Sequence, residues 1–202
     1  MHVLPVSATD RSVPLDVRMA RVAARQASLV TRGQLYALGL GRGAIEHRRA
    51  TGRLHRVHRG VFLVGAPPLP PLGREVAALL ACGADATLSF GSALACWGLA
   101  RTTPRAVHVT IPGLNRLRHP GIVVHTSTCM PPSDVRRHLG LPITGPGRTI
   151  IDVASSLAAR DVRWLVEEAL VRRLLTLEEL AATVDRHPRR RGAGRVRRVV
   201  DE

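Results

Sequence analysis

A run of four prolines divides the sequence and limits what its middle can fold into. The prolines stand at 67, 68, 70 and 71, inside the segment GAPPLPPLG at residues 65–73. Because proline lacks a backbone N–H and has a fixed φ, such a run excludes helix and strand and favours an extended linker. The 202 residues are enough for one or two domains with buried cores. The predicted divisions are a flexible N-terminus at 1–15, a first domain at 16–65, the linker at 66–73, a second domain at 74–185 and a basic tail at 186–202.

The charge is strongly positive and unevenly distributed. The net charge is +15, and every basic side chain is arginine because the sequence contains no lysine. Residues 1–65 hold eleven arginines against three acids, Asp10, Asp16 and Glu46. Composition bias explains the missing lysine but not the surplus of base over acid. A surface this positive attracts polyanions, and nucleic acid is the first candidate.

The segment LGLGRGAIEHRR, residues 38–49, holds three glycines in five positions. A dinucleotide-binding loop would need a strand before the first glycine, a helix after the third and an acid about 20 residues further on. Here the preceding residues predict a helix over 32–38, with Thr31 as N-cap and Gln34 completing a capping box. No Gly-Lys-Ser/Thr follows, so a nucleotide P-loop is not supported either.

The same glycines suit the turn of a helix-turn-helix. Residues 16–27 predict a first helix, and residues 42–51 predict a third helix that Gly52 ends. Gly39 suits a left-handed C-cap and Gly41 a tight reversal of the chain. The face of the first helix is predicted to consist of Val17, Ala20, Ala24 and Ala27. Two short helices joined by a glycine-containing turn form the helix-turn-helix unit.

A β-hairpin is predicted directly after this unit. In RLHRVHRGVFLVG, residues 54–57 and 61–64 predict two strands, with His58-Arg59-Gly60 as the turn. Three helices followed by a hairpin make a winged helix-turn-helix. The glycines are therefore interpreted as turn residues and not as a phosphate cradle.

This interpretation predicts which side chains contact DNA. The third helix would lie in the major groove, where Arg42, Glu46, His47 and Arg49 read base edges while Ala44, Ile45 and Arg48 face inward. The hairpin would meet phosphates or the minor groove through Arg53, His55, Arg56, His58 and Arg59. Thr31 and Arg32 would hold a backbone phosphate through amides and charge. The alternative is that these residues are only a solvated basic face.

The second region has a mixed pattern. REVAALLACG and SALACWGL predict helices, and AVHVTIPG (106–113) and GIVVHTST (121–128) predict strands joined by a basic connection at 114–120. From Arg148 onward the pattern is helical, and Thr176 and Glu179 have the spacing of a capping box. The fold class predicted is α+β, a winged helix-turn-helix followed by an α+β domain with a helical C-terminal part.

The sequence does not favour an enzyme. Between residues 70 and 160 the acids are Glu75, Asp85, Asp134 and Asp152, without the close pair that metal-assisted hydrolysis needs. His55-x-x-His58 has no cysteine nearby to complete a zinc site. The segment GPGRT could bind an anion at a helix start, but the i,i+4 spacing favours an Arg148–Asp152 ion pair. We expect no catalytic residue, no metal and no cofactor.

Cysteine usage and hydropathy predict a cytoplasmic protein. Cys82, Cys96 and Cys129 are widely spaced without a C-x-x-C pair, which is typical of reduced thiols. The first fifteen residues lack the charged region and apolar core of a secretory signal. No apolar run approaches the roughly 18 residues of a membrane span, so no membrane contact is expected.

The segment ARQASLVTRGQLYALGLGRGAIEHRRATGRLHRVHRGVFLVG, residues 24–65, resembles the N-terminal winged-helix domain of AbiEi-family antitoxins. These are transcriptional regulators of type IV toxin–antitoxin systems. The resemblance continues through SALACWGL, VHVTIPG, GIVVHTST and GPGRTIIDVA and covers roughly residues 20–185. It implies repression of the protein's own operon through binding of double-stranded operator DNA, beside a cognate nucleotidyltransferase-like toxin. A homodimer is also expected.

Three departures from the family pattern leave alternatives open. Arg49 stands where relatives usually carry an apolar residue, and Phe90-Gly91 stands where a His-Arg pair is common. Many relatives continue into a Vsr-like endonuclease domain, and this chain stops at Glu202, about where that domain would begin. The alternatives are a DNA-targeting remnant or subunit of such a nuclease and a nonspecific nucleic-acid-binding protein.

Overall fold

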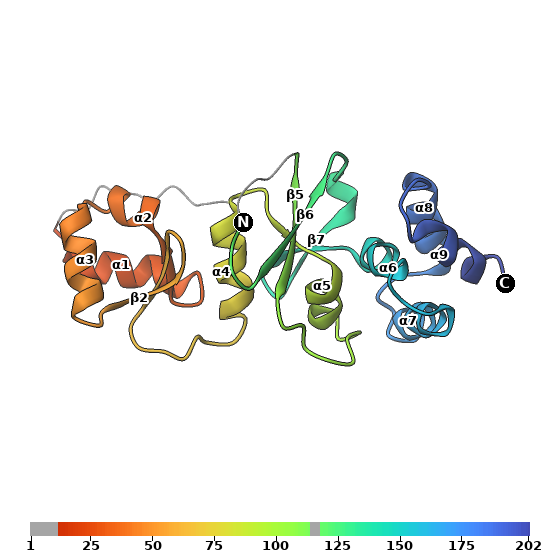
Figure 1. The fold of residues 1–202 in the computed structure, drawn as a ribbon, viewed down its shortest axis with the longest axis horizontal. Coiled ribbons are helices and arrows are strands. Elements are labelled where there is room, and N and C mark those ends of the chain that lie inside the picture. Colours follow the sequence, from red (N-terminus) through yellow and green to blue (C-terminus); the bar gives the residue numbers. More distant parts are fainter. Residues whose placement is uncertain (1–11, 114–117) are drawn as a thin grey trace. The chain divides into compact units, whose positions relative to one another are not determined.

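The computed structural model describes residues 12–113 and 118–202 and divides into two compact units (Figure 1). The first unit contains the described residues through Ala86 together with residues 118–122, and the second contains the remainder. Residues 1–11 of the predicted flexible N-terminus at 1–15 lie outside the described residues. The same holds for residues 114–117 of the predicted basic connection.

The first unit has the architecture of a winged helix-turn-helix. Its elements are α1 (Leu15–Ala24), β1 (Leu29–Thr31), α2 (Arg32–Ala37), α3 (Arg42–Ala50), β2 (Leu54–His58), β3 (Val61–Val64) and α4 (Gly73–Cys82). The three strands pair antiparallel in the order β1-β3-β2. The hairpin β2–β3, called the wing below, and the helices α1 to α3 agree with the prediction. The short strand β1 was not predicted.

The buried face of α1 differs from the predicted one. Met19 and Ala23 are buried, whereas Val17 is 43% exposed. The helix ends at Ala24, and Ala27 lies beyond it with a φ of 50°. The predicted face was therefore wrong. The longer apolar side chain of Met19 packs in the same core cluster as residues of α2, α3 and the sheet, and this contact sets the rotation of the helix.

The turn between α2 and α3 uses its glycines in different ways. Gly39 has a φ of +95°, the left-handed conformation predicted for a C-cap. Gly41 has an extended backbone, with a φ of −77°, and is the N-cap of α3. The predicted tight reversal at Gly41 was therefore wrong, and Gly39 supplies the left-handed residue of this turn.

A buried pair of amides fixes the start of α2. The predicted capping box is present: the Gln34 N–H donates to Thr31 Oγ1 at 3.2 Å, and the Thr31 N–H donates to Gln34 Oε1 at 2.8 Å. Gln34 and Gln26 also exchange two side-chain hydrogen bonds, of 2.9 and 3.0 Å. Both glutamines are buried, so each amide depends on the other.

Replacing Gln34 with Ala is expected to lower the free energy of unfolding by about 1–3 kcal/mol, because the buried Gln26 amide and the Thr31 N–H lose partners. Urea denaturation of the whole chain measures this change. The matched control is Tyr36→Ala on the same helix, because Tyr36 is 48% exposed. A loss no larger than in that control would contradict the structural role assigned to Gln34.

Helix α4 belongs to the first unit, so the second unit begins later than the predicted residue 74. The helix contacts all three strands of the N-terminal sheet. Val30 and Phe62 face α1 to α3. Leu29 and Leu63 alternate with them along the strands, so they lie on the other side of the sheet and form a second apolar face. This face needs a cover, and α4 provides it. The boundary between the units lies at Ala86 and Thr87.

The second unit combines a mixed sheet with a helical C-terminal part. Its elements are β4 (Thr87–Leu88), α5 (Phe90–Cys96), β5 (Val107–Pro112), β6 (Ile122–Ser127), a 3₁₀ turn (Pro132–Asp134), β7 (Val135–His138), β8 (Leu141–Thr144), α6 (Pro146–Ala154), α7 (Ala159–Val171), α8 (Leu177–Arg186) and α9 (Ala193–Val200). The strand order is β6-β5-β4-β8-β7, with β4 and β8 parallel. β5 and β6 match the predicted strands, whereas β4, β7 and β8 were not predicted.

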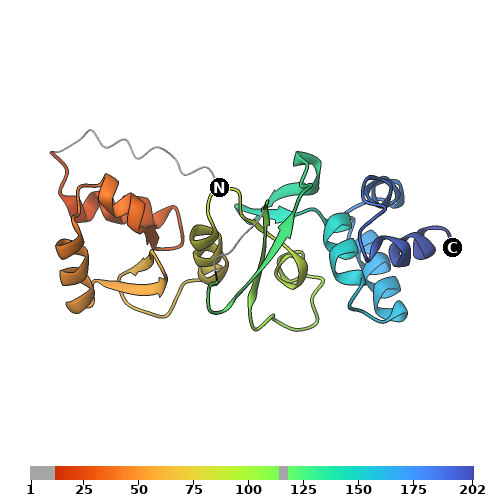
Figure 2. The same cartoon turned by 45° about the horizontal axis from the view of Figure 1, so that its top comes forward.

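The helices α7, α8 and α9 all pack against α6 (Figure 2). The predicted capping box at Thr176 and Glu179 is present. Within the predicted basic tail at 186–202 the structure has a helix, α9, which buries Ala193 and Val196 in the helical core. A Cβ at Gly192 would overlap the carbonyl oxygen of Ile151, so this glycine permits the close approach of the chain to α6. None of the helices in the described ranges has the length and apolar character that crossing a membrane requires.

Candidate nucleic-acid interface

Helix α3 presents one face to the core and one to solvent. Ile45 is 2% exposed, and Ala44 and Arg48 are partly buried beside it, as predicted. The Arg48 guanidinium donates to Asp16 Oδ1 at 3.0 Å and thereby ties α3 to α1. On the outer face, Arg42 and His47 are exposed. Among the described residues, no acid pairs with Arg42.

Arg49 occupies an intermediate position on α3. Its side chain is 36% exposed, and Nη1 lies 2.5 Å from Oε2 of Glu46, one turn earlier. This pair keeps the guanidinium at the edge of the core and neutralises both charges. One donor of Arg49 is bound to Glu46, so a DNA contact through that donor requires exchanging the ion pair for a contact with the nucleic acid. Arg42 needs no such exchange.

The wing carries exposed arginines and two partly buried histidines. Arg53, Arg56 and Arg59 are exposed, and Arg53 lies 3.9 Å from Asp16. His55 is within hydrogen-bond distance, 2.9 Å, of the Gly52 carbonyl oxygen.

His58 lies edge-on to His119, with ring centroids 6.3 Å apart. Burial lowers the pKa of His58, and the neighbouring His119 lowers it further. A lowered pKa favours the neutral imidazole. The positive charge that the wing offers to phosphates therefore comes from its arginines.

The start of α2 offers fewer donors than predicted. The Thr31 amide donates to Gln34, the Arg32 amide donates to the Gly60 carbonyl at 2.8 Å, and the Thr31 hydroxyl accepts from the Gln34 amide. These groups satisfy one another within the unit. The phosphate contact at Thr31 and Arg32 therefore stays a prediction, and the exposed Arg32 side chain is the group that would carry it.

The second unit holds a buried charge cluster that only partly follows from the sequence. Arg148 is 1% exposed, and its Nε donates to Asp152 Oδ1 at 3.0 Å, the predicted i,i+4 pair. Its Nη1 donates to Asp134 Oδ2 at 2.8 Å. Arg190 Nη1 also donates to Asp152, and His187 Nε2 lies 2.6 Å from Asp134. These contacts join α6 to the turn before β7 and to the segment before α9.

The pKa values of the cluster reflect its burial. Burial raises the pKa of Asp152, although Arg148 and Arg190 oppose this shift. Burial also lowers the pKa of His187, against the opposing effect of Asp134. Within residues 12–113 and 118–202, no group of three or more His, Cys, Asp or Glu side chains is placed to hold a metal ion. The cluster is best interpreted as the polar core of the helical part.

Phe90 joins a second pair of histidines. Its ring stacks on His125 with centroids 3.7 Å apart, and His108 Nδ1 lies 3.0 Å from His125 Nε2. Burial, and then the neighbouring His108, lower the pKa of His125 to about 4. Burial also lowers the pKa of His108. Both rings are therefore neutral near pH 7.

The folded protein is expected to lose stability as the pH falls from about 6.5 to about 4. His125 has a folded pKa of about 4, below the 6.5 of an unfolded chain, so protons bind the unfolded state first. His58, His108 and His187 act in the same direction. Thermal unfolding across this pH range should show a smaller decline for His125→Phe, which keeps a ring on Phe90. The control is His47→Gln, which replaces an exposed histidine. If stability declines as much in His125→Phe as in this control, the contribution assigned to His125 is contradicted.

Two family models match the chain. The model described as a transcriptional regulator, AbiEi antitoxin, matches residues 17–65, and the model described as the AbiEi antitoxin C-terminal domain matches residues 84–201. A comparison with curated proteins found no match. Among solved structures, the RV2827C protein from Mycobacterium tuberculosis has a similar fold, with a TM-score of 0.58 and 19% sequence identity. This similarity covers 98% of the present chain and 80% of that chain.

Proposed function

Because the chain belongs to the AbiEi antitoxin family of transcriptional regulators, we propose that it binds double-stranded operator DNA and represses its own operon. The first unit would bind the DNA. The chain would act by binding and not by catalysis, in the cytoplasm, where its target DNA lies.

One observation carries this proposal: α3 keeps Ile45 in the core while it exposes Arg42 and His47 on the opposite face. A short helix that is held by its core side and leaves arginine exposed can enter the major groove, where a guanidinium binds O6 and N7 of guanine with two hydrogen bonds. Such contacts distinguish one base pair from another. Arg42 is therefore the principal base-reading residue in this proposal.

The wing would add affinity without sequence information. The exposed guanidinium groups of Arg53, Arg56 and Arg59 suit phosphate oxygens, which position a protein on the duplex. The nearby acids Asp16 and Glu46 already pair with arginines of α3, so they oppose phosphate binding less than free carboxylates would. Each phosphate contact also makes binding depend on salt.

Two protein partners belong to the proposal. A repressor dimer with twofold symmetry reads two half-sites of a palindromic operator, which multiplies the specificity of a single α3. We therefore include a homodimer. The antitoxin family also suggests a cognate toxin protein as a second partner.

The test is a competition gel shift with the whole chain and a labelled DNA fragment from upstream of its gene. A specific regulator should prefer this fragment to random duplex by about 10³-fold or more, with binding that weakens steeply as salt rises. Equal competition by random duplex would contradict operator recognition. Equal affinity for single and double strands would instead support a nonspecific nucleic-acid-binding protein.

A further inference from the structure

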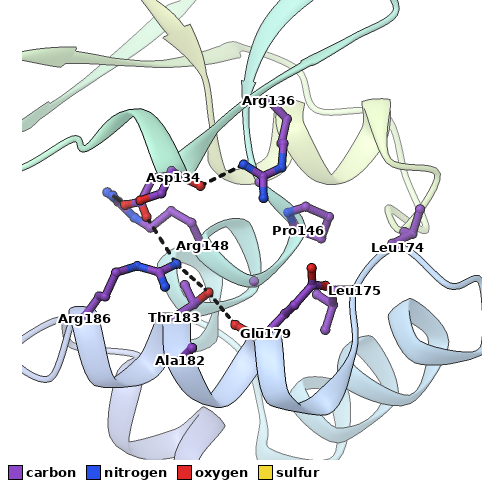
Figure 3. Close-up of a pocket in the computed structure, with 13 residues that line it drawn as sticks. Asp134, Arg136, Pro146, Arg148, Leu174, Leu175, Glu179, Ala182, Thr183 and Arg186 are labelled. Atoms are coloured by element: carbon purple, nitrogen blue, oxygen red, sulfur yellow. Dashed lines mark hydrogen bonds and ion pairs between the residues drawn. The ribbon is translucent and has the colours of Figure 1, made fainter.

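A pocket of about 250 Å³ lies in the second unit, between the start of α6, the strand β7 and the helix α8 (Figure 3). Arginines from all three elements line it: Arg136 from β7, Arg148 from α6 and Arg186 from α8. We infer that this pocket binds a small oxyanion, a phosphate or carboxylate group. The site is distinct from the residues proposed to contact DNA, which belong to the first unit, and does not depend on the proposed function.

The two outer arginines retain unused donors. Arg136 donates from Nη1 to the Ser133 carbonyl at 3.0 Å, and Arg186 donates from Nη2 to Thr183 Oγ1 at 3.0 Å. A guanidinium has five N–H donors, so each side chain keeps further donors for an acceptor in the pocket. Arg186 Nη2 also lies 3.8 Å from Asp134 Oδ1, and the side chain is 42% exposed, so it can adjust to share its donors with a ligand.

The third arginine is buried with one nitrogen unsatisfied. Arg148 is 1% exposed, and its Nη2 has no hydrogen-bond partner among the described residues. A buried donor without an acceptor costs free energy, and an anion in the pocket that Arg148 lines would remove that cost. This orphaned donor is a second observation that points to an anionic ligand.

The start of α6 adds amide donors to the same pocket. Gly145 is the N-cap and has no side chain to cap the helix, and Pro146 has no N–H. The first-turn amide of Gly147 therefore has no acceptor within the helix. Gly147 is buried and lines the pocket, so an anion bound there would give this amide an acceptor. Amides and dipole at a helix start favour negative charge.

Each of the two acids of the pocket is engaged by the chain through one carboxylate oxygen. Asp134 accepts from Arg148 and lies beside His187, and Glu179 accepts from the Thr176 amide in its capping box. Asp134 Oδ1 has no hydrogen-bond partner among the described residues and lies 3.8 Å from Arg186 Nη2, and Arg148 is shared with the buried Asp152. Arg136, Arg186 and the helix start therefore supply the positive charge that an anion in the pocket would meet. The volume is just below the range of about 300–1,000 Å³ that holds drug-sized ligands, so it suits a small anion.

Titration with inorganic phosphate tests the inference on the unchanged chain. Thermal unfolding is measured at constant ionic strength while phosphate replaces chloride, and a saturable rise in melting temperature is expected. The backbone amide signals of Gly147 and Thr183 should shift along the same binding curve in NMR spectra. A parallel titration with acetate separates the two sources, because a carboxylate site responds to acetate and a phosphate site does not.

Variants then locate the site. Arg136→Gln and Arg186→Gln should each weaken phosphate binding by about tenfold, the loss of about one charge-assisted hydrogen bond. The control is Arg137→Gln, because Arg137 is on the same strand, donates to the Gly140 carbonyl and does not line the pocket. Equal weakening by the control would overturn the site, since diffuse positive charge would then explain binding. If the variants do not fold, the NMR titration of the unchanged chain is sufficient by itself. Gly147 and Thr183 signals that do not shift as phosphate is added would overturn the inference.

Discussion

Replacing Arg148 with Met is expected to lower the free energy of unfolding by about 3–5 kcal/mol. The guanidinium is the shared partner of Asp134 and Asp152, and both carboxylates are almost completely buried, with 0% and 1% side-chain exposure. Removing it leaves negative charge in a site that water does not reach, which costs more than the loss of an exposed ion pair. Urea denaturation of the whole chain, followed by circular dichroism, measures the change.

The matched control is Arg137→Met, which removes an exposed arginine from β7 and should change stability by about 0.5 kcal/mol or less. Adding Asp134→Asn to Arg148→Met should restore part of the lost stability, because it removes one of the unpaired charges. A double variant that is no more stable than Arg148→Met would contradict the explanation by buried charge. Equal stability of Arg148→Met and the control would contradict the central role of Arg148 in the cluster.

Replacing Arg53, Arg56 and Arg59 together with Gln is expected to weaken binding to all DNA sequences, by about tenfold for each arginine–phosphate ion pair removed near 0.1 M salt. Their guanidinium groups are exposed on the wing and suit phosphates, so the slope of log affinity against log salt should fall by about three. The preference for the upstream fragment over random duplex should remain, because phosphates carry no direct sequence information. Fluorescence anisotropy at several salt concentrations measures the slope and the preference.

A triple variant of the second unit tests whether net charge alone explains the weaker binding. Arg160→Gln, Arg189→Gln and Arg191→Gln remove the same three charges from exposed positions outside the wing. This variant should keep most of the affinity. An equal decrease in affinity in both triple variants would argue for general attraction instead of contacts by the wing.

The elements that the sequence predicted are those set by local chemistry. The capping boxes at Thr31 and Thr176 each join two residues that are three positions apart. Gly39 lies just beyond the end of α2, where a glycine commonly takes the left-handed conformation, and it does so here. The two hairpin strands flank a glycine-containing turn, and the second strand, Val61–Val64, is entirely apolar. Such features are decided within a few residues and agree with the structure.

The missed elements depend on distant partners. β4 contains only Thr87 and Leu88, and it is a strand because it pairs with β5 and β8. α9 is stabilised by burial of its apolar side chains against α6. Its arginines make this buried face difficult to recognise in the sequence. Arg190 reaches Asp152 across 38 positions. No local pattern could have predicted these contacts.

For the candidate interface, the sequence predicted which side chains are near the surface but not how they pair. The outward positions of Arg42 and His47 follow from the 3.6-residue period of α3. The ion pair between Arg49 and Glu46 and the contact of His58 with His119 depend on side-chain conformation and on a distant segment. These pairings decide which of the predicted residues offer charge to a nucleic acid.

Methylation of guanine N7 by dimethyl sulfate tests most directly whether α3 enters the major groove, because N7 is exposed there. The whole chain bound to its upstream fragment should protect a defined set of guanines. Arg42→Ala should lose protection at one of them in each half-site, and Arg59→Gln should weaken the whole set alike. Binding to the fragment with no change in N7 reactivity, or an Arg42→Ala pattern identical to that of the unchanged protein, would contradict the central claim.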